Sequence, residues 1–416
     1  MKRLLKVTAM TGLLTLLRMA MGFVIAKVVA IYTGPTGLAM LGQVQSMITS
    51  FSGIINAPVG SGIVRYTAEN KDQGFEACVT WWRASVQWIM IISTIVIPPS
   101  LLLSGKISEW LFQDDKLSWV VITTASTLPL VAIGTLCNSV INGLQLYRRY
   151  VIFGLVSTLL SGAVMIVMIC FYHIQGALLA AAIQSALIGI IMLIGNLREP
   201  WFRLSYWWGA IEPKARKQIG GYMLMAVTTA FTVPISIILV RSILVEQVGW
   251  EAAGHWQAVW KISEVYLGVI TMALGTYFLP RLASLVGVDA ISKEINSTAK
   301  VIVPIIITIS FIVYLMRDVA IGLLFTEEFR PARELFSIQL SGDIFKVIAW
   351  LYAYPMLSRG ATKWFVSSEV IFSVSFVALA YVFILKLGVE GACFAYMINY
   401  ILYLSYILIN YKKFSK

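Results

Sequence analysis

The sequence predicts an all-α polytopic membrane protein with about twelve transmembrane helices. Of its 416 residues, 59% are hydrophobic and only 12% are charged, whereas soluble domains are about 25% charged. Apolar runs of about 20 residues recur from one end of the chain to the other, and each can cross roughly 30 Å of hydrocarbon. A single, very hydrophobic soluble core is the alternative, and these repeated span-length runs count against it.

The predicted spans fall into two sets of six, separated by a polar and aromatic stretch at 198–217. This stretch, "REPWFRLSYWWGAIEPKARK", places aromatic side chains beside Lys and Arg, which suits a membrane interface. We therefore expect an N-terminal six-helix lobe (1–197), a cytoplasmic interfacial linker (198–217) and a C-terminal six-helix lobe (218–416). The spans are expected near 7–32, 37–65, 79–103, 119–146, 150–172, 175–197, 218–244, 252–282, 300–325, 332–358, 364–386 and 389–411.

Positive charge predicts that both chain termini are cytoplasmic. With this orientation most of the 32 Lys and Arg residues face the cytoplasm, as the positive-inside rule requires. The net charge of +12 then faces anionic inner-leaflet lipid, so nucleic-acid binding is not needed to explain it. The predicted outside segments hold only Lys106, Lys116, Arg330, Arg333 and Lys386.

The motifs of several other protein classes are missing from the sequence. The four cysteines are scattered and the two histidines form no H-E-x-x-H motif, so we predict no disulfide framework, metal site or cofactor. A Walker-type ATP site is absent, and the first span is too long and lacks the cleavage site of a secretory signal.

The two halves of the chain resemble each other. "IQGALLAAAIQ" at 174–184 matches "VEGACFAYMIN" at 389–399, and "LFQDD" at 111–115 matches "LFTEE" at 324–328, at nearly the same offset. This indicates a duplication in which spans 1–6 and 7–12 share one orientation. Parallel repeats of this kind are a transporter design, with the substrate site between the halves.

The first span carries two cations. Arg18 lies near the middle of this span and continues a polar stripe through Thr11 and Thr15. A charge at mid-membrane costs about 2.5–3.5 kcal/mol on the insertion scale, so it is best tolerated facing water or a partner. We predict that Arg18 lines a polar cavity. Lys27 is nearer the outer end, where it either lines the same path or is a plain interfacial lysine.

Two later spans carry an acid and a base three residues apart. Lys261 and Glu264 form one such pair, and Asp343 and Lys346 form the other. One interpretation is an ion pair that makes insertion tolerable; the other is that these residues line the transport path, with the acids as proton-coupling groups. The same helix faces add the polar residues Gln257 and Gln339.

Further polar residues extend the predicted path. The second span has a small and polar seam that includes Ser46 and Asn56, although such seams often serve only close helix packing. Toward the outside we predict a vestibule with Arg241, Arg317 and Asp318. The slight positive excess of the deep charges suits an anionic substrate such as a phosphate or pyrophosphate.

Three stretches resemble a known family. They are "YTGPTGLAMLGQVQSMITSFSGI", "GHWQAVWKISEVYLGVITMALGTYFLPRL" and "MRDVAIGLLFTEEFRPARELFSIQLSGDIFKV". Through them the chain resembles, over essentially its full length, the Wzx-type O-antigen and lipid-linked oligosaccharide flippases. These belong to the multidrug/oligosaccharidyl-lipid/polysaccharide exporter superfamily.

The resemblance implies a V-shaped pair of six-helix lobes in a bacterial inner membrane. It implies alternating-access transport of undecaprenyl-pyrophosphate-linked repeat units for lipopolysaccharide biosynthesis, from the cytoplasmic to the periplasmic leaflet. Membrane lipids and the polymerase and chain-length regulator of the same pathway are the implied partners. Related lipid flippases bind pyrophosphate through basic residues on helices 1, 2 and 8. Arg18 and Lys261 match the first and third, whereas Arg65, the only cation of the second span, lies at its inner end.

Two other functions are compatible with a polytopic membrane protein of this kind. A multidrug or cation antiporter of the same superfamily would be expected to carry unpaired carboxylates, but each deep acid here has a basic neighbour. A polysaccharide polymerase or ligase would be expected to carry a large outer loop with catalytic groups, and the sequence has none. We therefore expect a transporter rather than an enzyme. Without an ATP site, it must draw on an ion gradient, the membrane potential or product removal.

Overall fold

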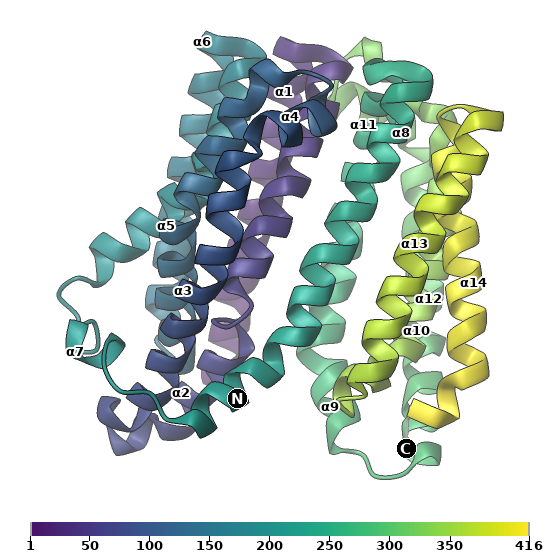
Figure 1. Cartoon of the computed structure of the whole chain (residues 1–416). Coiled ribbons are helices and arrows are strands. Elements are labelled where there is room, and N and C mark those ends of the chain that lie inside the picture. Colours follow the sequence, from purple (N-terminus) through teal and green to yellow (C-terminus); the bar gives the residue numbers. More distant parts are fainter. Residues whose placement is uncertain (1, 415–416) are drawn as a thin grey trace. The chain divides into compact units, whose positions relative to one another are not determined.

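The structure is a computed structural model that describes residues 2–414, with side chains at 10–60, 62–220, 223–275 and 277–414. Every regular element in this part of the chain is a helix (Figure 1). Long apolar sequences adopt helices in a membrane because a helix satisfies all of its backbone hydrogen bonds internally.

Three of the helices are too long to be single spans. They are α1 (Lys2–Asn56), α6 (Tyr147–Asn196) and α8 (Pro213–Ala273), with 55, 50 and 61 residues. A straight helix of this length would measure about 75–90 Å, against roughly 30 Å of hydrocarbon. Each one leaves helical geometry at a single residue: Gly34 (φ 62°), His173 (φ 49°) and Gly249 (φ 87°).

Contacts within α8 and α6 show that the chain reverses at these points. The Arg241 guanidinium donates to the Gln257 side-chain carbonyl at 2.5 Å, although 16 residues of straight helix would separate them by about 24 Å. In α6, a Cβ added to Gly176 would lie 2.0 Å from the Met168 carbonyl oxygen. Both helices are therefore hairpins of two spans.

The number of spans agrees with the sequence. Eight helices of the described chain are long and apolar enough to cross a membrane, and the three double-length ones raise the number of spans to eleven. The twelfth is α12 (Phe336–Ser358), which has 23 residues but carries Asp343 and Lys346. The predicted all-α fold with twelve spans is confirmed. The remaining long helices are α3 (Val79–Leu102), α5 (Ser118–Gly143), α10 (Val288–Leu315), α13 (Thr362–Leu387) and α14 (Glu390–Phe414).

Short helices connect the spans. They are α2 (Ser61–Asn70), α4 (Ser104–Phe112), α7 (Leu204–Trp207), α9 (Leu279–Ser284) and α11 (Arg317–Leu324). A π-helical turn, Leu274–Phe278, joins α8 to α9.

The helices form two compact units. The first contains residues 1–32 and 43–234, and the second contains 33–42 and 235–416. In the first unit, the Trp82 ring stacks on Trp207 at 4.8 Å and its indole N–H donates to the Thr67 hydroxyl at 2.9 Å. In the second, Leu267, Phe278 and Val347 belong to one buried apolar cluster. The lobe boundary placed at 198–217 stays a prediction.

A glycine contact between α5 and α6 yields a test of the packing. A Cβ on Gly189 would lie 2.1 Å from the Leu130 carbonyl oxygen, so the two backbones touch. We expect Gly189→Ala to lower the free energy of unfolding by about 1–3 kcal/mol, because the helices must separate. Thermal unfolding in detergent measures this. Gly322→Ala on α11, where nothing lies within 4 Å of the added Cβ, is the control; equal melting temperatures for the two variants would contradict the close contact.

Candidate functional site

An open cavity of about 390 Å³ lies within the second unit and is lined by α12, α14 and the second half of α8. Helical spacing brings its polar residues to one side of each helix, because residues three, four, seven and eleven apart share a face. Part of each polar face recognised in the sequence of these spans lines this cavity, whereas Gln257, Lys261 and Asp343 lie outside its lining. The lining includes Trp260, Glu264, Gln339, Lys346, Trp350 and Tyr396.

Asp343 is buried beside the cavity and is held by hydroxyl groups. Its side chain is 0% exposed. It accepts hydrogen bonds from the Ser263 hydroxyl at 2.7 Å, the Tyr396 hydroxyl at 2.7 Å and the Tyr266 hydroxyl. The donors come from α8 and α14, so one α12 carboxylate ties three helices together. Hydrogen bonds to an ionised acceptor are about twice as strong as neutral ones.

Lys346 extends into a cage of aromatic rings. Its ammonium nitrogen lies 5.0 Å from the ring centre of Trp350, 5.2 Å from those of Tyr396 and Tyr400, and 5.5 Å from that of Trp260. A cation at this distance from an aromatic face is stabilised by the ring quadrupole. Among the described residues, no ion pair within 4.0 Å joins Lys346 to Asp343, but the two charges lie close enough to interact electrostatically.

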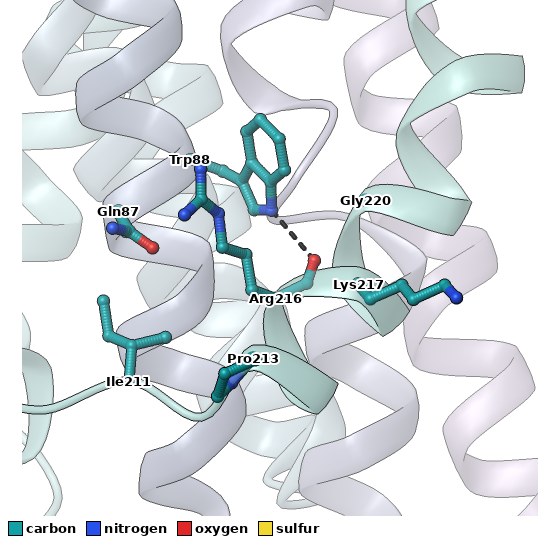
Figure 2. Close-up of a pocket in the computed structure, with 7 residues that line it drawn as sticks. All are labelled: Gln87, Trp88, Ile211, Pro213, Arg216, Lys217 and Gly220. Atoms are coloured by element: carbon teal, nitrogen blue, oxygen red, sulfur yellow. Dashed lines mark hydrogen bonds between the residues drawn. The ribbon is translucent and has the colours of Figure 1, made fainter.

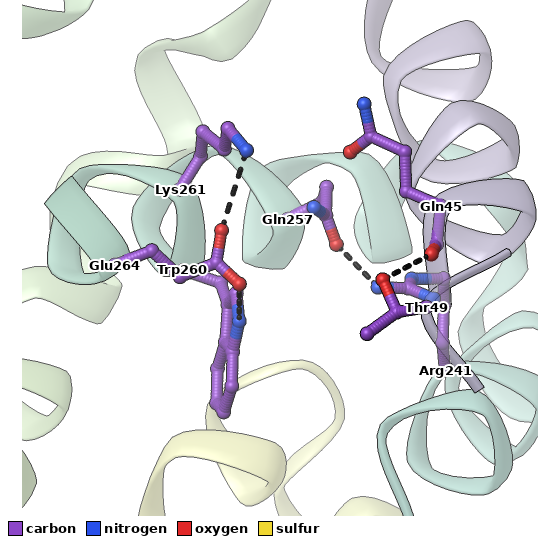
Figure 3. A network of polar contacts seen from close by, with 7 residues as sticks. All are labelled: Gln45, Thr49, Arg241, Gln257, Trp260, Lys261 and Glu264. Atoms are coloured by element: carbon purple, nitrogen blue, oxygen red, sulfur yellow. Dashed lines mark hydrogen bonds and ion pairs between the residues drawn. The ribbon is translucent and has the colours of Figure 1, made fainter. Parts of the chain in front are cut away.

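Lys261 and Glu264 do form the ion pair that their spacing suggests (Figure 3). The lysine nitrogen lies 3.3 Å from one carboxylate oxygen, and the other oxygen accepts from the Trp260 indole N–H at 3.0 Å. The pair is partly open, with 26% of the Lys261 side chain and 48% of the Glu264 side chain exposed. An exposed pair contributes little to stability, which leaves both charges available to a ligand.

Gln339 is a buried amide that lines the cavity. Its residue is 0% exposed, and in the part of the chain that the structure describes neither its amide oxygen nor its amide nitrogen has a hydrogen-bond partner. An unsatisfied buried polar group costs about 1–3 kcal/mol. The arrangement therefore favours a polar ligand or water in the cavity.

Arg241 lies inside the second unit rather than on an open vestibule surface. Only 1% of it is exposed. Its guanidinium donates to Gln257, as Figure 3 shows, and lies 5.7 Å from the Trp256 ring centre.

The other two predicted vestibule residues do not pair with each other. Arg317 lies over the Tyr314 ring at 4.2 Å, while Asp318 forms an ion pair with Arg333 at 3.4 Å.

The cations of the first unit differ in their surroundings. Arg18 is exposed on α1, and a Cβ added to Gly154 of α6 would lie 3.3 Å from its guanidinium nitrogen. Among the described residues Arg18 has no hydrogen-bond or ion-pair partner. Lys27 is half-buried, and Arg65 forms an exposed ion pair with Glu69 at 2.8 Å.

The polar seam of the second span takes part in helix packing. A Cβ on Gly53 would lie 2.6 Å from the Ala230 Cβ, which supports the packing interpretation of this seam. Ser46 and Asn56 are half-buried on the same helix.

Sequence reasoning missed the aromatic and hydroxyl partners of Asp343 and Lys346. Tyr396 and Tyr400 are one helical turn apart on α14 and both face the cage around Lys346. Their spacing was a signal for a shared face, but the sequence does not tell which helix that face meets.

Comparison with solved structures defines the class of fold. Lipid II flippase MurJ in an inward closed conformation matches with a TM-score of 0.73, at 14% identity over 99% of this chain and 90% of that one. An inward-facing multidrug resistance MATE family transporter of the MOP superfamily matches with a TM-score of 0.72, at 14% identity over 96% of this chain and 98% of that one. The chain has the fold of these transporters. No family model matches it.

One curated relative is more similar in sequence. The chain is 29% identical to the lipid III flippase of Escherichia coli (strain K12), over 97% of this chain and 96% of that protein. The resemblance to lipid-linked oligosaccharide flippases that the sequence motifs indicated is thereby confirmed.

Proposed function

We propose that this protein is a flippase that moves undecaprenyl-pyrophosphate-linked oligosaccharide repeat units from the cytoplasmic to the periplasmic leaflet of a bacterial inner membrane. The observation that carries the proposal is Arg18, an exposed guanidinium in mid-span without a partner among the described residues. Such a charge must be compensated by water or by an anionic ligand. The full-length similarity to a lipid III flippase supports a lipid-linked anion.

Within this proposal, basic residues receive the pyrophosphate. Arg18 of the first unit is a proposed phosphate ligand, because a guanidinium engages two phosphate oxygens at once. Lys261 of the second unit is another, because it is only loosely paired. Lys27 and Lys346 add positive charge along the path, and Arg65 guides the headgroup in from the cytoplasmic side. Both chain termini are proposed to be cytoplasmic, since the charge bias requires this orientation.

The cavity of the second unit is proposed to receive a polar part of the same substrate. Gln339 supplies an amide without a partner among the described residues, and Glu264 supplies an exposed carboxylate. Both groups suit the hydroxyl groups of a sugar, which can donate and accept hydrogen bonds. A pocket lined mainly by apolar and aromatic side chains with a few placed polar groups is typical of a small-molecule site.

Proton coupling is proposed to act through Glu264. A pyrophosphate that arrives near Lys261 competes with Glu264 for the ammonium group. The carboxylate then loses its counter-charge and takes up a proton, which links substrate binding to proton movement. Asp343 is a second candidate, but its three hydroxyl partners suit a structural anion better.

Exchanging the charges of the α8 pair tests this coupling. We expect the variant Lys261→Glu/Glu264→Lys to lose most transport at normal protein levels. A coupling site requires each charge at its own position, and the exchange moves both. The measurement is flipping in proteoliposomes with and without an imposed pH gradient. The matched control exchanges another pair three residues apart, Glu327→Arg/Arg330→Glu, whose groups lie 2.8 Å apart and are more than three-quarters exposed. Full transport and an unchanged gradient response in the α8 swap would make the pair purely structural.

A multidrug or cation antiporter is the competing function, because a MATE transporter shares the fold. The proteins compared above are named as flippases or a transporter rather than as enzymes, so a polymerase or ligase has no support among them. The antiporter differs in substrate charge. It would bind cations, whereas the predicted path here has exposed basic groups.

A further inference from the structure

The interfacial stretch 198–217 is ordered and packs against α3 of the first unit. The Arg83 guanidinium of α3 donates to the backbone carbonyl oxygens of Ser205 at 2.7 Å and Ala210 at 3.3 Å. The chain passes so closely that a Cβ on Gly209 would lie 2.7 Å from the Arg83 guanidinium carbon. With Trp207 stacked on Trp82, the stretch is fixed against α3 over several residues.

A second cavity, of about 470 Å³, lies where this stretch enters α8 (Figure 2). Gln87 and Trp88 of α3 form one side, and Arg216, Lys217 and Gly220 of α8 form another. The Trp88 indole N–H donates to the Arg216 backbone carbonyl at 3.1 Å, and the Arg216 guanidinium lies 5.3 Å from the Trp88 ring centre. The tryptophan thus fixes both the backbone and the charged end of Arg216.

Two cations line this cavity, and the one acid next to its lining residues, Glu212, forms no ion pair with either of them among the described residues. Arg216 and Lys217 are exposed, and among the described residues neither side chain has a carboxylate partner. The stretch contains two acids, and one of them, Glu199, already pairs with Arg149 at 2.5 Å. The Gln87 amide oxygen is buried without a hydrogen-bond partner among the described residues. The cavity therefore offers two cations and an unpaired amide.

The surroundings of the cavity suit a lipid headgroup. The α3 helix is a candidate membrane span, and Trp208 and Leu204 of the interfacial stretch are 63% and 79% exposed. Tryptophan beside Lys and Arg is typical of the membrane–water interface. Basic pockets at this level bind lipid phosphates.

We propose that this cavity binds the phosphodiester headgroup of an anionic phospholipid of the surrounding bilayer. Arg216 engages two phosphate oxygens, and Lys217 adds a second positive charge. The Gln87 side-chain amide can be flipped so that its N–H group, rather than its oxygen, points to the headgroup and donates to it. This site lies in the first unit on α3 and α8, it is separate from the groups proposed to bind the transported substrate, and it goes beyond the proposed function.

The test measures lipid binding to the purified full-length protein in detergent. The probes are dioctanoyl phosphatidylglycerol, dioctanoyl phosphatidylcholine, inorganic phosphate and undecaprenyl pyrophosphate. We expect phosphatidylglycerol to bind more tightly than phosphatidylcholine or inorganic phosphate. The variant Arg216→Gln/Lys217→Gln should weaken its binding roughly 25-fold, because each surface cation contributes roughly fivefold.

Two further variants distinguish a specific binding cavity from nonspecific electrostatic attraction. Gly220→Leu keeps every charge but fills the cavity, since a Cβ there already lies 3.4 Å from the Trp88 ring; it should also weaken phosphatidylglycerol binding. Lys412→Gln/Lys413→Gln removes the same charge from the exposed end of α14, where Lys413 likewise lies over a tryptophan, Trp364, at 5.9 Å; it should bind normally.

Three results would overturn the proposal. The first is that phosphatidylcholine or inorganic phosphate binds as tightly as phosphatidylglycerol. The second is that the α14 control loses as much binding as the Arg216→Gln/Lys217→Gln variant. The third is that undecaprenyl pyrophosphate binds at this cavity in preference to phosphatidylglycerol. The last result would assign the cavity to the transported lipid instead of the bilayer.

Discussion

Replacing Arg18 by alanine is expected to lower transport at least about tenfold, since a hydrogen bond to a charged group contributes about 1.5–3 kcal/mol. Arg18→Lys should fall between the alanine variant and the unchanged protein, because lysine keeps the charge but loses the planar fork that engages two phosphate oxygens. Protein level should stay normal, because Arg18 is exposed. Export of the lipid-linked sugar measures the effect.

The control for Arg18 is Arg148, an exposed arginine of the same unit at the start of α6. Arg148→Ala and Arg148→Lys should both transport normally. If Arg18→Ala sustains full surface-polymer output, Arg18 is a structural cation and the pyrophosphate site must be sought elsewhere.

The second large effect is on stability. Asp343→Ala should lower the free energy of unfolding by about 3 kcal/mol or more, because it leaves the hydroxyl groups of Ser263, Tyr266 and Tyr396 without their acceptor. Tyr396→Phe and Ser263→Ala remove one donor each and should cost about 1–3 kcal/mol. Chemical or thermal unfolding in detergent measures these differences.

Asp318→Ala is the matched control, because this acid is half exposed and its ion pair with Arg333 spans 3.4 Å. It should change stability by less than about 1 kcal/mol. A loss in Asp343→Ala no larger than this would show that the three hydroxyl contacts contribute nothing to folding.

Hydropathy predicted most of the fold. The gaps between predicted spans at 33–36, 173–174 and 245–251 contain Gly34, His173 and Gly249, the residues at which the three double-length helices leave helical geometry. Span length alone requires a reversal there, since no helix of 50 residues fits within one bilayer. The sequence did not predict that 198–217 would be fixed by Arg83, because that contact joins residues more than 120 positions apart.

For the candidate site, the sequence predicted which residues share a polar helix face, but not which helix faces meet. A 3.6-residue period identified Glu264 and Gln339 as members of polar faces, and both line one cavity. The same local reasoning paired Asp343 with Lys346. These two charges do interact, but partners from other helices complete their surroundings: hydroxyl groups contact the acid and aromatic rings surround the lysine. Spacing along one helix carries no information about which residues of α8 and α14 meet α12.

The most direct test of the central claim uses purified protein in proteoliposomes. The substrate is undecaprenyl pyrophosphate carrying an oligosaccharide, and transfer between leaflets is followed by the accessibility of the sugar from outside. We expect protein-dependent transfer that requires the pyrophosphate and is lost in Arg18→Ala. Transfer of organic cations instead, with no movement of the lipid-linked sugar, would contradict the assignment and identify an antiporter.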